Sequence, residues 1–371
     1  MLHIKEVETK KEFNQFLKLP YKIHANHENW VPPLLLDEKM FFDKNVNPAF
    51  KNDRTMLLIA YKDSEPVGRI MGIIKKSGKI ETAARFGFMD TYDDIEVYNA
   101  LMERIEEWVK SFGYSKIIGP YGFSDQDPEG YIIEGYEYEV TIATNYNFPW
   151  VIDYLERRGY TKEIDYVVYQ IDVAKPIPEI FLKINKRLIE RGEYTFLEFK
   201  KKKELKPYAD KMMQVMNETY VHLFGYEALD EAESKFLIKR FWDLIDPRFI
   251  KAVEKDGDFC GFLISIPNLS EGFKKAKGRL LPFGIFHLLK AGKNSKQCDL
   301  LIAGARDIYK NKGLDIWGMV AIINESKKAG YKYIDSHHEL ETNYKVRAEM
   351  EKFGGKLIKK FRVYQKELSA N

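Results

Sequence analysis

The stretch "YKNKGLDIW" (309–317) has the residue types of a turn that binds phosphate, with a single glycine. It follows an apolar run, "CDLLIAGA" (298–305), expected to form a buried strand, and it precedes an expected helix over 314–330. The first N–H groups of a helix lack partners in the helix and lie at its positive end, so they can bind an anion. Gly313 allows close approach to the backbone, and Lys310 and Lys312 add positive charge. An ordinary strand–helix loop is the alternative interpretation.

A second group of reactive side chains lies in "DSHHELE" (335–341), at the end of the next expected strand. His337, His338, Glu339 and Glu341 are candidates for a general base that deprotonates an amine. For each of them, a simply solvated strand end is the alternative. The histidine pair also suggests a metal, but no third ligand follows at a clear spacing, so we predict no metal site.

Segment 298–354 resembles the GNAT superfamily of acyl-CoA-dependent N-acyltransferases. Members have a strand, a turn of the form Arg/Gln-x-x-Gly-x-Gly/Ala, a helix, a strand, and an Asn-containing start of another helix that ends in Gly. "YKNKGLD" lies at the place of that turn, and "ETNYKVRAEMEKFGG" at the place of the second motif. The resemblance covers about 190–368 well and about 55–173 more weakly, so the whole chain looks like a bacterial tandem-GNAT protein.

The resemblance implies acetyl-CoA or another acyl-CoA as cofactor, with acetyl-CoA placed first. Lys310 takes the Arg/Gln place and Gly313 the place of the first glycine. Asp315 replaces the second small residue, and its carboxylate would be unfavourable near a pyrophosphate unless it points away. By resemblance, the cofactor-binding residues are Ala303, Ala305 and Arg306 for the pantetheine arm, Lys310, Asn311, Lys312, Gly313 and Leu314 for the pyrophosphate, and Asn343 for the cofactor arm.

Many family members use a tyrosine to protonate the leaving thiolate, and Met350 stands at that position here. A thioether cannot donate a proton. Tyr344, Tyr309 or a water would have to replace it. We therefore expect Glu341 and His337 to supply the base, and Tyr344 the acid.

Landmarks in the two halves of the chain recur in the same order. Gly68 is matched by Gly261 at a step of 193, Gly113 by Gly330 at 217, and Gly159 by Gly354 at 195. We predict a duplication, with an N-terminal degenerate GNAT-like domain over 1–175 and a C-terminal GNAT domain with the acyl-CoA site over 176–371. The predicted fold class is α/β (α+β), each domain being a mixed, mostly antiparallel sheet flanked by helices.

Two segments distinguish the halves. "MDTYDD" (89–94) replaces the phosphate turn in the first half with three carboxylates and no glycine, so we predict that this half has lost cofactor binding. The longer middle step fits an insertion over about 269–296, which mixes lysines with Leu, Phe and Ile. A lid, a membrane-surface contact or a dimer element are the interpretations, and a lid or packing role is favoured.

Composition limits the classes of protein. Residues 1–175 carry 22 Lys and Arg against 29 Asp and Glu, whereas residues 176–371 carry 37 against 27, which suits an anionic ligand on the second half. Two cysteines cannot form a Cys-based zinc site. The charged N-terminus and the short apolar run 280–289 indicate a cytoplasmic protein without a signal peptide or a bilayer-crossing segment.

We therefore expect an N-acyltransferase that transfers an acyl group from acyl-CoA to a small-molecule amine by direct attack. A non-catalytic acyl-CoA-binding or scaffold protein is one alternative, and an acyl or aminoacyl transferase acting on a larger carrier is another. No nucleic-acid partner is expected, membrane contact is not favoured, and a homodimer remains open.

Overall fold

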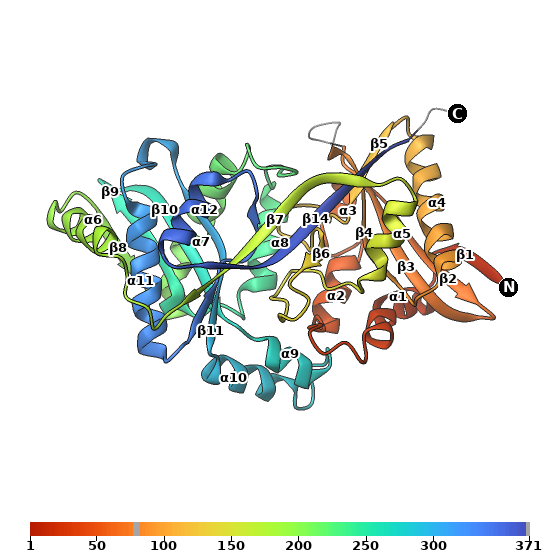
Figure 1. The fold of residues 1–371 in the computed structure, drawn as a ribbon, viewed down its shortest axis with the longest axis horizontal. Helices are drawn as coiled ribbons and strands as arrows, with labels where there is room; N and C mark the ends of the chain where they lie inside the picture. The colour runs from red at the N-terminus through yellow and green to blue at the C-terminus, as the bar shows by residue number, and fades with distance from the viewer. Residues whose placement is uncertain (77–81, 369–371) are drawn as a thin grey trace. The chain divides into compact units, whose positions relative to one another are not determined.

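The computed structural model describes residues 1–76 and 82–368, and the chain forms two compact units (Figure 1). Unit 1 comprises residues 1–166, 270–289 and 359–371, and unit 2 comprises residues 167–269 and 290–358. Neither unit is a continuous stretch, because most of the insertion and the last residues of the chain belong to unit 1. These units cut across the two predicted halves, 1–175 and 176–371.

Unit 1 is a sheet with helices on both faces. Its strand order is β1-β2-β3-β4-β5-β14, and β6 also pairs with β14. Helices α4 and α5 pack on one face, and α1 and α2 on the other. The strands are β1 Leu2–Glu6, β2 Arg54–Lys62, β3 Glu65–Ile74, β4 Ala84–Thr91, β5 Lys116–Gly119, β6 Tyr131–Glu134 and β14 Lys356–Glu367. The helices are α1 Lys10–Ile23, α2 Leu35–Phe42, α3 Ala49–Asn52, α4 Ile95–Ser111, α5 Trp150–Arg157 and α9 Ser270–Ala276, and α10 Gly284–Asn294 begins here.

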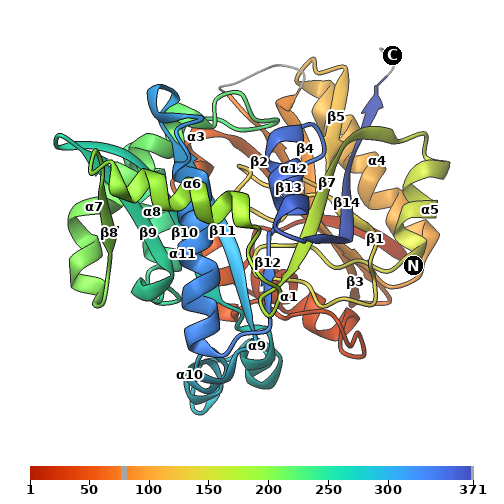
Figure 2. The ribbon, with the colours of Figure 1, turned by 60° about the vertical axis from the view of Figure 1, so that its left-hand side comes forward.

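Unit 2 has the same layered plan. Its strand order is β8-β9-β10-β11-β12-β7, and β13 pairs with β7. Helices α6 and α11 pack on one face, where Figure 2 shows α6 lying across α11, and α7 and α8 cover the other. The strands are β7 Thr161–Asp172, β8 Thr195–Glu198, β9 Ile250–Lys255, β10 Asp258–Pro267, β11 Gln297–Ala305, β12 Tyr333–Asp335 and β13 Glu339–Leu340. The helices are α6 Glu179–Glu190, α7 Lys202–Thr219, α8 Glu231–Phe241, α11 Leu314–Ala329 and α12 Tyr344–Lys352, with short 3-10 helices at Pro247–Phe249 and Asp307–Tyr309.

The two halves of the sequence exchange their last strands. Strand β7 ends the first half, but its residues pair with β12 in unit 2, where Asp172 lies opposite Tyr333. Strand β14 ends the second half, but it pairs with β5 in unit 1, where Tyr364 lies opposite Gly119. Each sheet is therefore completed by the last strand of the other half.

Both sheets are mixed and mostly antiparallel. Among the described pairs, β4 with β5 is parallel in unit 1 and β11 with β12 is parallel in unit 2, whereas the hairpins β2–β3 and β9–β10 are antiparallel. The predicted architecture, a mixed sheet flanked by helices in each of two parts, is confirmed.

Helix α4 shows how local sequence sets these elements. The Asp94 side chain accepts the N–H groups of Glu96 and Val97, so the carboxylate-rich stretch before the helix caps it. Leu101 and Ile105 follow at helical spacing and are fully buried against the sheet. Among the described residues, no helix combines the length and apolar character that a bilayer crossing requires.

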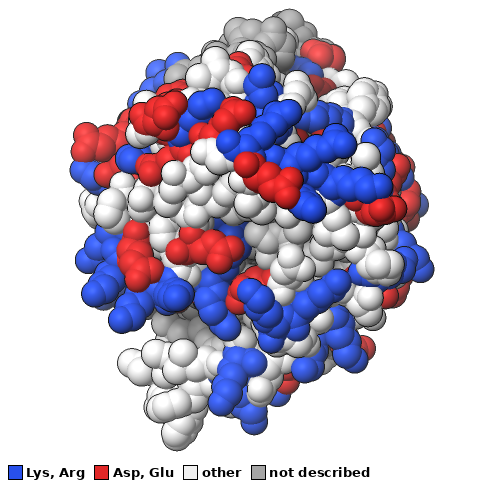
Figure 3. Space-filling model, turned by 90° about the vertical axis from the view of Figure 1, so that its left-hand side faces the viewer, with Lys and Arg blue, Asp and Glu red and all other residues white. Residues whose placement is uncertain are grey.

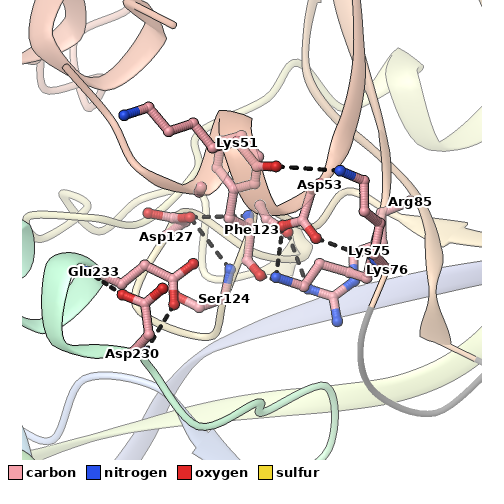
Figure 4. Close-up of polar contacts among 12 residues, drawn as sticks. Lys51, Asp53, Lys75, Lys76, Arg85, Phe123, Ser124, Asp127, Asp230 and Glu233 are labelled. Atoms are coloured by element: carbon pink, nitrogen blue, oxygen red, sulfur yellow. Dashed lines mark hydrogen bonds and ion pairs between the residues drawn. The ribbon is translucent and has the colours of Figure 1, made fainter. Parts of the chain in front are cut away.

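Unit 1 also contains a buried ion pair. Lys75 Nζ lies 2.7 Å from Asp53 Oδ2, and the two side chains are 7% and 1% exposed (Figure 4). The second Asp53 oxygen accepts the Lys76 N–H at 3.2 Å. Burial of charge is costly unless the charge is paired, so this carboxylate stabilises the end of β3.

Asp53→Ala is expected to lower the free energy of unfolding by about 3 kcal/mol, because it leaves the buried Lys75 ammonium without this carboxylate. Urea denaturation followed by tryptophan fluorescence measures the change. Glu179→Ala, which removes an exposed pair with Lys183 on α6, is the control and is expected to be close to neutral. Equal effects of the two substitutions would contradict the role of burial.

Candidate active site

In unit 2, strand β11 pairs with β12 only through its first three residues. The parallel pairing runs from Gln297 opposite Tyr333 to Asp299 opposite Asp335, where β12 ends. Strand β11 continues to Ala305, paired with β10 along its other edge. The register with β10 shifts between Ile264 and Ser265, so β11 is also irregular at this level. Beyond Asp299, the edge of β11 that faced β12 is open to a ligand with hydrogen-bonding groups of its own.

A tyrosine hydroxyl meets the open part of β11. Tyr220, at the end of α7, donates from its hydroxyl to the Ala303 carbonyl at 3.0 Å and accepts the Ala303 N–H at 3.3 Å. Ala303 itself is exposed. Its two backbone groups are those that the sequence analysis assigned to the pantetheine arm, so Tyr220 lies where such an arm would pair.

The turn after β11 leaves a run of backbone donors. Among the described residues, the N–H groups of Asn311 to Asp315 have no acceptor. Asn311 has φ +60° and Gly313 has φ +87°, both in the left-handed region. A Cβ at Gly313 would also lie 3.1 Å from Ile184 of α6, so both φ and space favour glycine. Successive free N–H groups at the start of a helix form an anion-binding concavity, which fits a pyrophosphate.

Some of the basic residues around this turn form ion pairs with acidic side chains, and one is more accessible. Lys310 pairs with Asp307, whereas Lys312 is exposed. The Arg306 guanidinium pairs with Asp258 and, at 2.8 Å, with Glu218. Arg306 is therefore held beside β10 and α7, which leaves Lys312 as the more accessible cation at the turn.

The Asp315 carboxylate is turned toward α12. Its Oδ1 accepts the Ile316 N–H at 3.0 Å, and its Oδ2 lies 3.2 Å from Lys345 Nζ. The ion pair joins the first turns of α11 and α12. Lys345 thus balances the charge of Asp315, and the N–H groups from Asn311 to Asp315 stay available to bind an anion.

The loop after β12 carries the predicted bases and is fixed through its backbone. The His337 N–H donates to Asp335 Oδ1 at 2.8 Å, and Ser336 Oγ donates to the His337 carbonyl at 2.9 Å. Arg347 Nη1 donates to the Glu341 carbonyl at 2.6 Å. The side chains of His337 and Glu341 are half-buried, and His337 has φ +58°. A non-glycine residue held in this region is strained, which is common where a side chain must be placed for function.

The predicted residues on α12 have distinct environments. Asn343 precedes the helix without capping it through its side chain, so its amide is not committed to the helix start. Tyr344 is 73% exposed, whereas Met350 is buried in the core with α11. The position of the family's usual acid is thus a packing position here.

Two carboxyl groups stand out by their raised pKa values: Glu339, already a candidate base from the sequence, and Glu349, which the sequence did not indicate. Burial, followed by the charge of Glu349, raises the pKa of Glu339 to about 8. Burial, followed by Asp315, raises the pKa of Glu349 to about 7. Glu339 lies in the "HHELE" pattern that already indicated a base, but nothing in the local sequence showed that Glu349 would face it from α12.

In the first half, internal pairs occupy the carboxylates of "MDTYDD". Asp90 lies 2.8 Å from Arg69 Nε and 2.8 Å from His24 Nε2, and Arg69 with His24 holds the pKa of this carboxyl below its usual range despite burial. Asp94 caps α4 and pairs with Lys62. That this half has lost cofactor binding stays a prediction. Among the described residues, no group of three or more His, Cys, Asp and Glu side chains could hold a metal ion.

Comparison with known proteins places these features in context. No protein-family model matches the sequence. The chain is 27% identical over 380 residues to the bacterial ceramide synthase of Caulobacter vibrioides, covering 99% of this chain and 98% of that protein. It is 25% identical over 389 residues to the protein YghO of Escherichia coli, covering 97% and 94%.

Solved structures show the same fold at low sequence identity. A tandem GNAT protein from the clavulanic acid biosynthesis pathway aligns over 100% of both chains with a TM-score of 0.59 and 10% identity. A conserved protein of unknown function from Enterococcus faecalis aligns over 99% of this chain and 73% of its own, with a TM-score of 0.53 and 10% identity. The predicted fold of two GNAT-like domains is therefore confirmed.

The raised pKa values predict a pH dependence of stability. The folded protein holds the Glu339 proton more tightly than the unfolded chain, so this contribution is complete below about pH 4.5 and is lost as the pH rises through about 8. Glu339→Gln, which is neutral at every pH, is expected to flatten the fall in melting temperature between about pH 5 and pH 8.

Glu349→Gln is expected to act with the same sign, because the pKa of Glu349 is also raised, to about 7. Glu179→Gln, on a side chain of α6 that is 79% exposed, is the control. Melting curves of wild type and Glu339→Gln that shift in parallel with pH would contradict the raised pKa of Glu339.

Proposed function

We propose that this protein is an acyl-CoA-dependent N-acyltransferase whose cofactor site lies in unit 2. The observation that carries the proposal is the run of unpaired N–H groups from Asn311 to Asp315 beside the open end of β11. The turn would take the pyrophosphate, with Lys312 beside it. The backbone at Ala303 would take the pantetheine arm once the Tyr220 hydroxyl moves aside.

The reaction would be direct transfer. The amine nitrogen attacks the thioester carbonyl carbon, the C–N bond forms, and the C–S bond breaks to release CoA. A base must remove a proton from the amine, and a carboxyl group or histidine with a pKa near the working pH suits that step. Glu341 and His337 are the bases that the sequence favoured, and Glu339, a further candidate from the sequence, has its pKa raised to about 8.

The structure supports a general acid for the leaving thiolate less well than it supports a general base for the amine. Met350 cannot donate a proton, and Tyr344, the candidate acid, is largely exposed. A thiolate leaves much more readily than an alkoxide, so it needs no acid to leave and can take its proton from water afterwards. The same features support the second candidate function, a protein that binds acyl-CoA without catalysis.

The relative named bacterial ceramide synthase suggests the acceptor class. A ceramide is an amide of a long-chain amino alcohol with a fatty acid. We therefore propose a long-chain amine as acceptor, and fatty acyl-CoA as a donor to be tested beside the acetyl-CoA that the sequence placed first.

Gly313→Ala is expected to lower the affinity for CoA about tenfold or more, because a Cβ at φ +87° strains the turn and crowds Ile184. The thermal shift on titration with CoA, acetyl-CoA and palmitoyl-CoA measures this. Gly330→Ala is the matched control at the other end of α11, with φ +75° and no atom within 4 Å of the added Cβ.

Gly330→Ala should lower the melting temperature but keep the CoA-induced shift of the wild type. Equal losses of that shift in both variants would remove the turn as the binding site. A wild type that shows no shift with any of the three ligands would contradict acyl-CoA binding altogether.

In a thiol-release assay with acyl-CoA and a long-chain amine, loss of the base is expected to lower kcat about 100-fold. Glu341→Gln, His337→Ala and Glu339→Gln are compared for kcat, KM and the pH profile, and Tyr344→Phe tests the acid. Activity unchanged in all four would exclude these residues. CoA binding without thiol release, across a panel of amines, would favour the non-catalytic alternative.

A further inference from the structure

The insertion exposes an apolar surface. Between the end of α9 and the middle of α10, the exposed fractions are 79% for Leu281, 68% for Phe283, 45% for Ile285, 64% for Phe286 and 65% for Leu289. Clustered exposure of large apolar side chains is uncommon on soluble proteins and marks an interaction surface. We call this set the α10 apolar surface.

The orientation of α10 follows from its small residues. Gly284 and Ala291, seven positions apart, are buried, and His287 and Leu288 between them are half-buried. A Cβ at Gly284 would lie 1.8 Å from the Arg279 carbonyl oxygen, so the start of the helix packs directly on the preceding turn. The helix is therefore held by one face, and the α10 apolar surface lies on the other.

Basic residues surround this surface. Between residues 269 and 296 there are seven lysines and arginines and one acidic residue, Glu271. Lys274 pairs with Glu139, and Lys275 with Glu271. The others are exposed and form no ion pair with a described residue: Lys277, Arg279, Lys290, Lys293 and Lys296. Figure 3 shows uncharged atoms at the bottom of the view, where Figures 1 and 2 place α10, with Lys and Arg side chains beside them.

We propose that the α10 apolar surface binds the surface of an anionic phospholipid bilayer. Phe283, Phe286 and Leu289 would enter the boundary between headgroups and acyl chains, and Lys290 and Lys293 would contact phosphate groups. A helix with aromatic and aliphatic residues on one side and lysines at its borders has the composition of helices that lie in the membrane interface.

Charge favours a bilayer over a second copy of this chain. A symmetric dimer through this surface would bring two strongly basic borders together, and like charges across an interface oppose association. The sequence offered a membrane-surface contact as one interpretation of this insertion but favoured a lid or packing role, and it excluded only a segment that crosses the bilayer. A helix that lies in the interface need not be long enough to cross.

Co-sedimentation with vesicles tests the proposal. The wild type is expected to bind vesicles of phosphatidylcholine mixed with phosphatidylglycerol, and to bind phosphatidylcholine alone about tenfold less. The double variant Phe283→Ser with Phe286→Ser is expected to lose at least about tenfold in binding to the mixed vesicles. Lys290→Glu with Lys293→Glu should lower binding to the mixed vesicles and weaken its dependence on salt.

The control removes two exposed apolar side chains elsewhere. Ile180 and Ile189 of α6 are 59% and 50% exposed, and Ile180→Ser with Ile189→Ser should bind vesicles as the wild type does. Melting temperatures of all variants show that the fold is kept.

A wild type that binds neither kind of vesicle would overturn the proposal, as would unchanged binding of the Phe283→Ser, Phe286→Ser variant. Sedimentation velocity tests the alternative that a second copy of this chain occupies the α10 apolar surface. A wild-type dimer that this variant converts to monomer, without vesicle binding, would assign the surface to a second copy instead. None of these measurements depends on the acyl-transfer activity.

Discussion

The early end of the pairing between β11 and β12 is the constraint on which the candidate site depends. Parallel strands that stayed paired to Ala305 would satisfy each other's backbone groups and leave nothing for a ligand. Because β12 stops at Asp335, the end of β11 faces outward and the turn that follows starts α11 beside an open strand edge. The chain reverses there through Asn311 and Gly313, whose left-handed φ values expose successive N–H groups. In the described part of the chain, strand, turn and helix thus bring main-chain donors and acceptors without main-chain partners close together in the chain.

The negative charge near the turn after β11 is smaller than the number of acidic residues there suggests, which favours the binding of an anion. Three acidic residues lie around this turn, but Lys345 balances Asp315, and the raised pKa values of Glu339 and Glu349 mean that both are partly protonated near neutral pH. Burial therefore reduces the negative charge beside the turn. It also brings the pKa of a carboxyl group close to neutral pH, where that group can accept or donate a proton. Burial would therefore favour both the proposed cofactor binding and the proposed chemistry.

Sequence reasoning succeeded where conformation is local. Gly313 is the N-cap residue of α11, and the helix runs from Leu314 to Ala329 against a predicted 314–330. It could not supply contacts between residues far apart in the chain. Tyr220 reaches Ala303 across 83 positions, and Glu349 meets Asp315 only because α11 and α12 pack together. The exchange of β7 and β14 escaped prediction for the same reason, since both strands have the right pattern for either sheet.

That exchange has a consequence for how the chain is made. The sheet of unit 1 holds residues 1–166 beside β14, whose residues 359–367 follow every residue of unit 2 in the chain. During synthesis, the edge of β5 therefore stays unpaired until the residues of unit 2 have been made. An exposed strand edge is prone to wrong pairing. Completion of the sheet of unit 1 thus depends on synthesis of the segment that forms unit 2, and a product truncated before β14 would carry the edge of β5 unpaired.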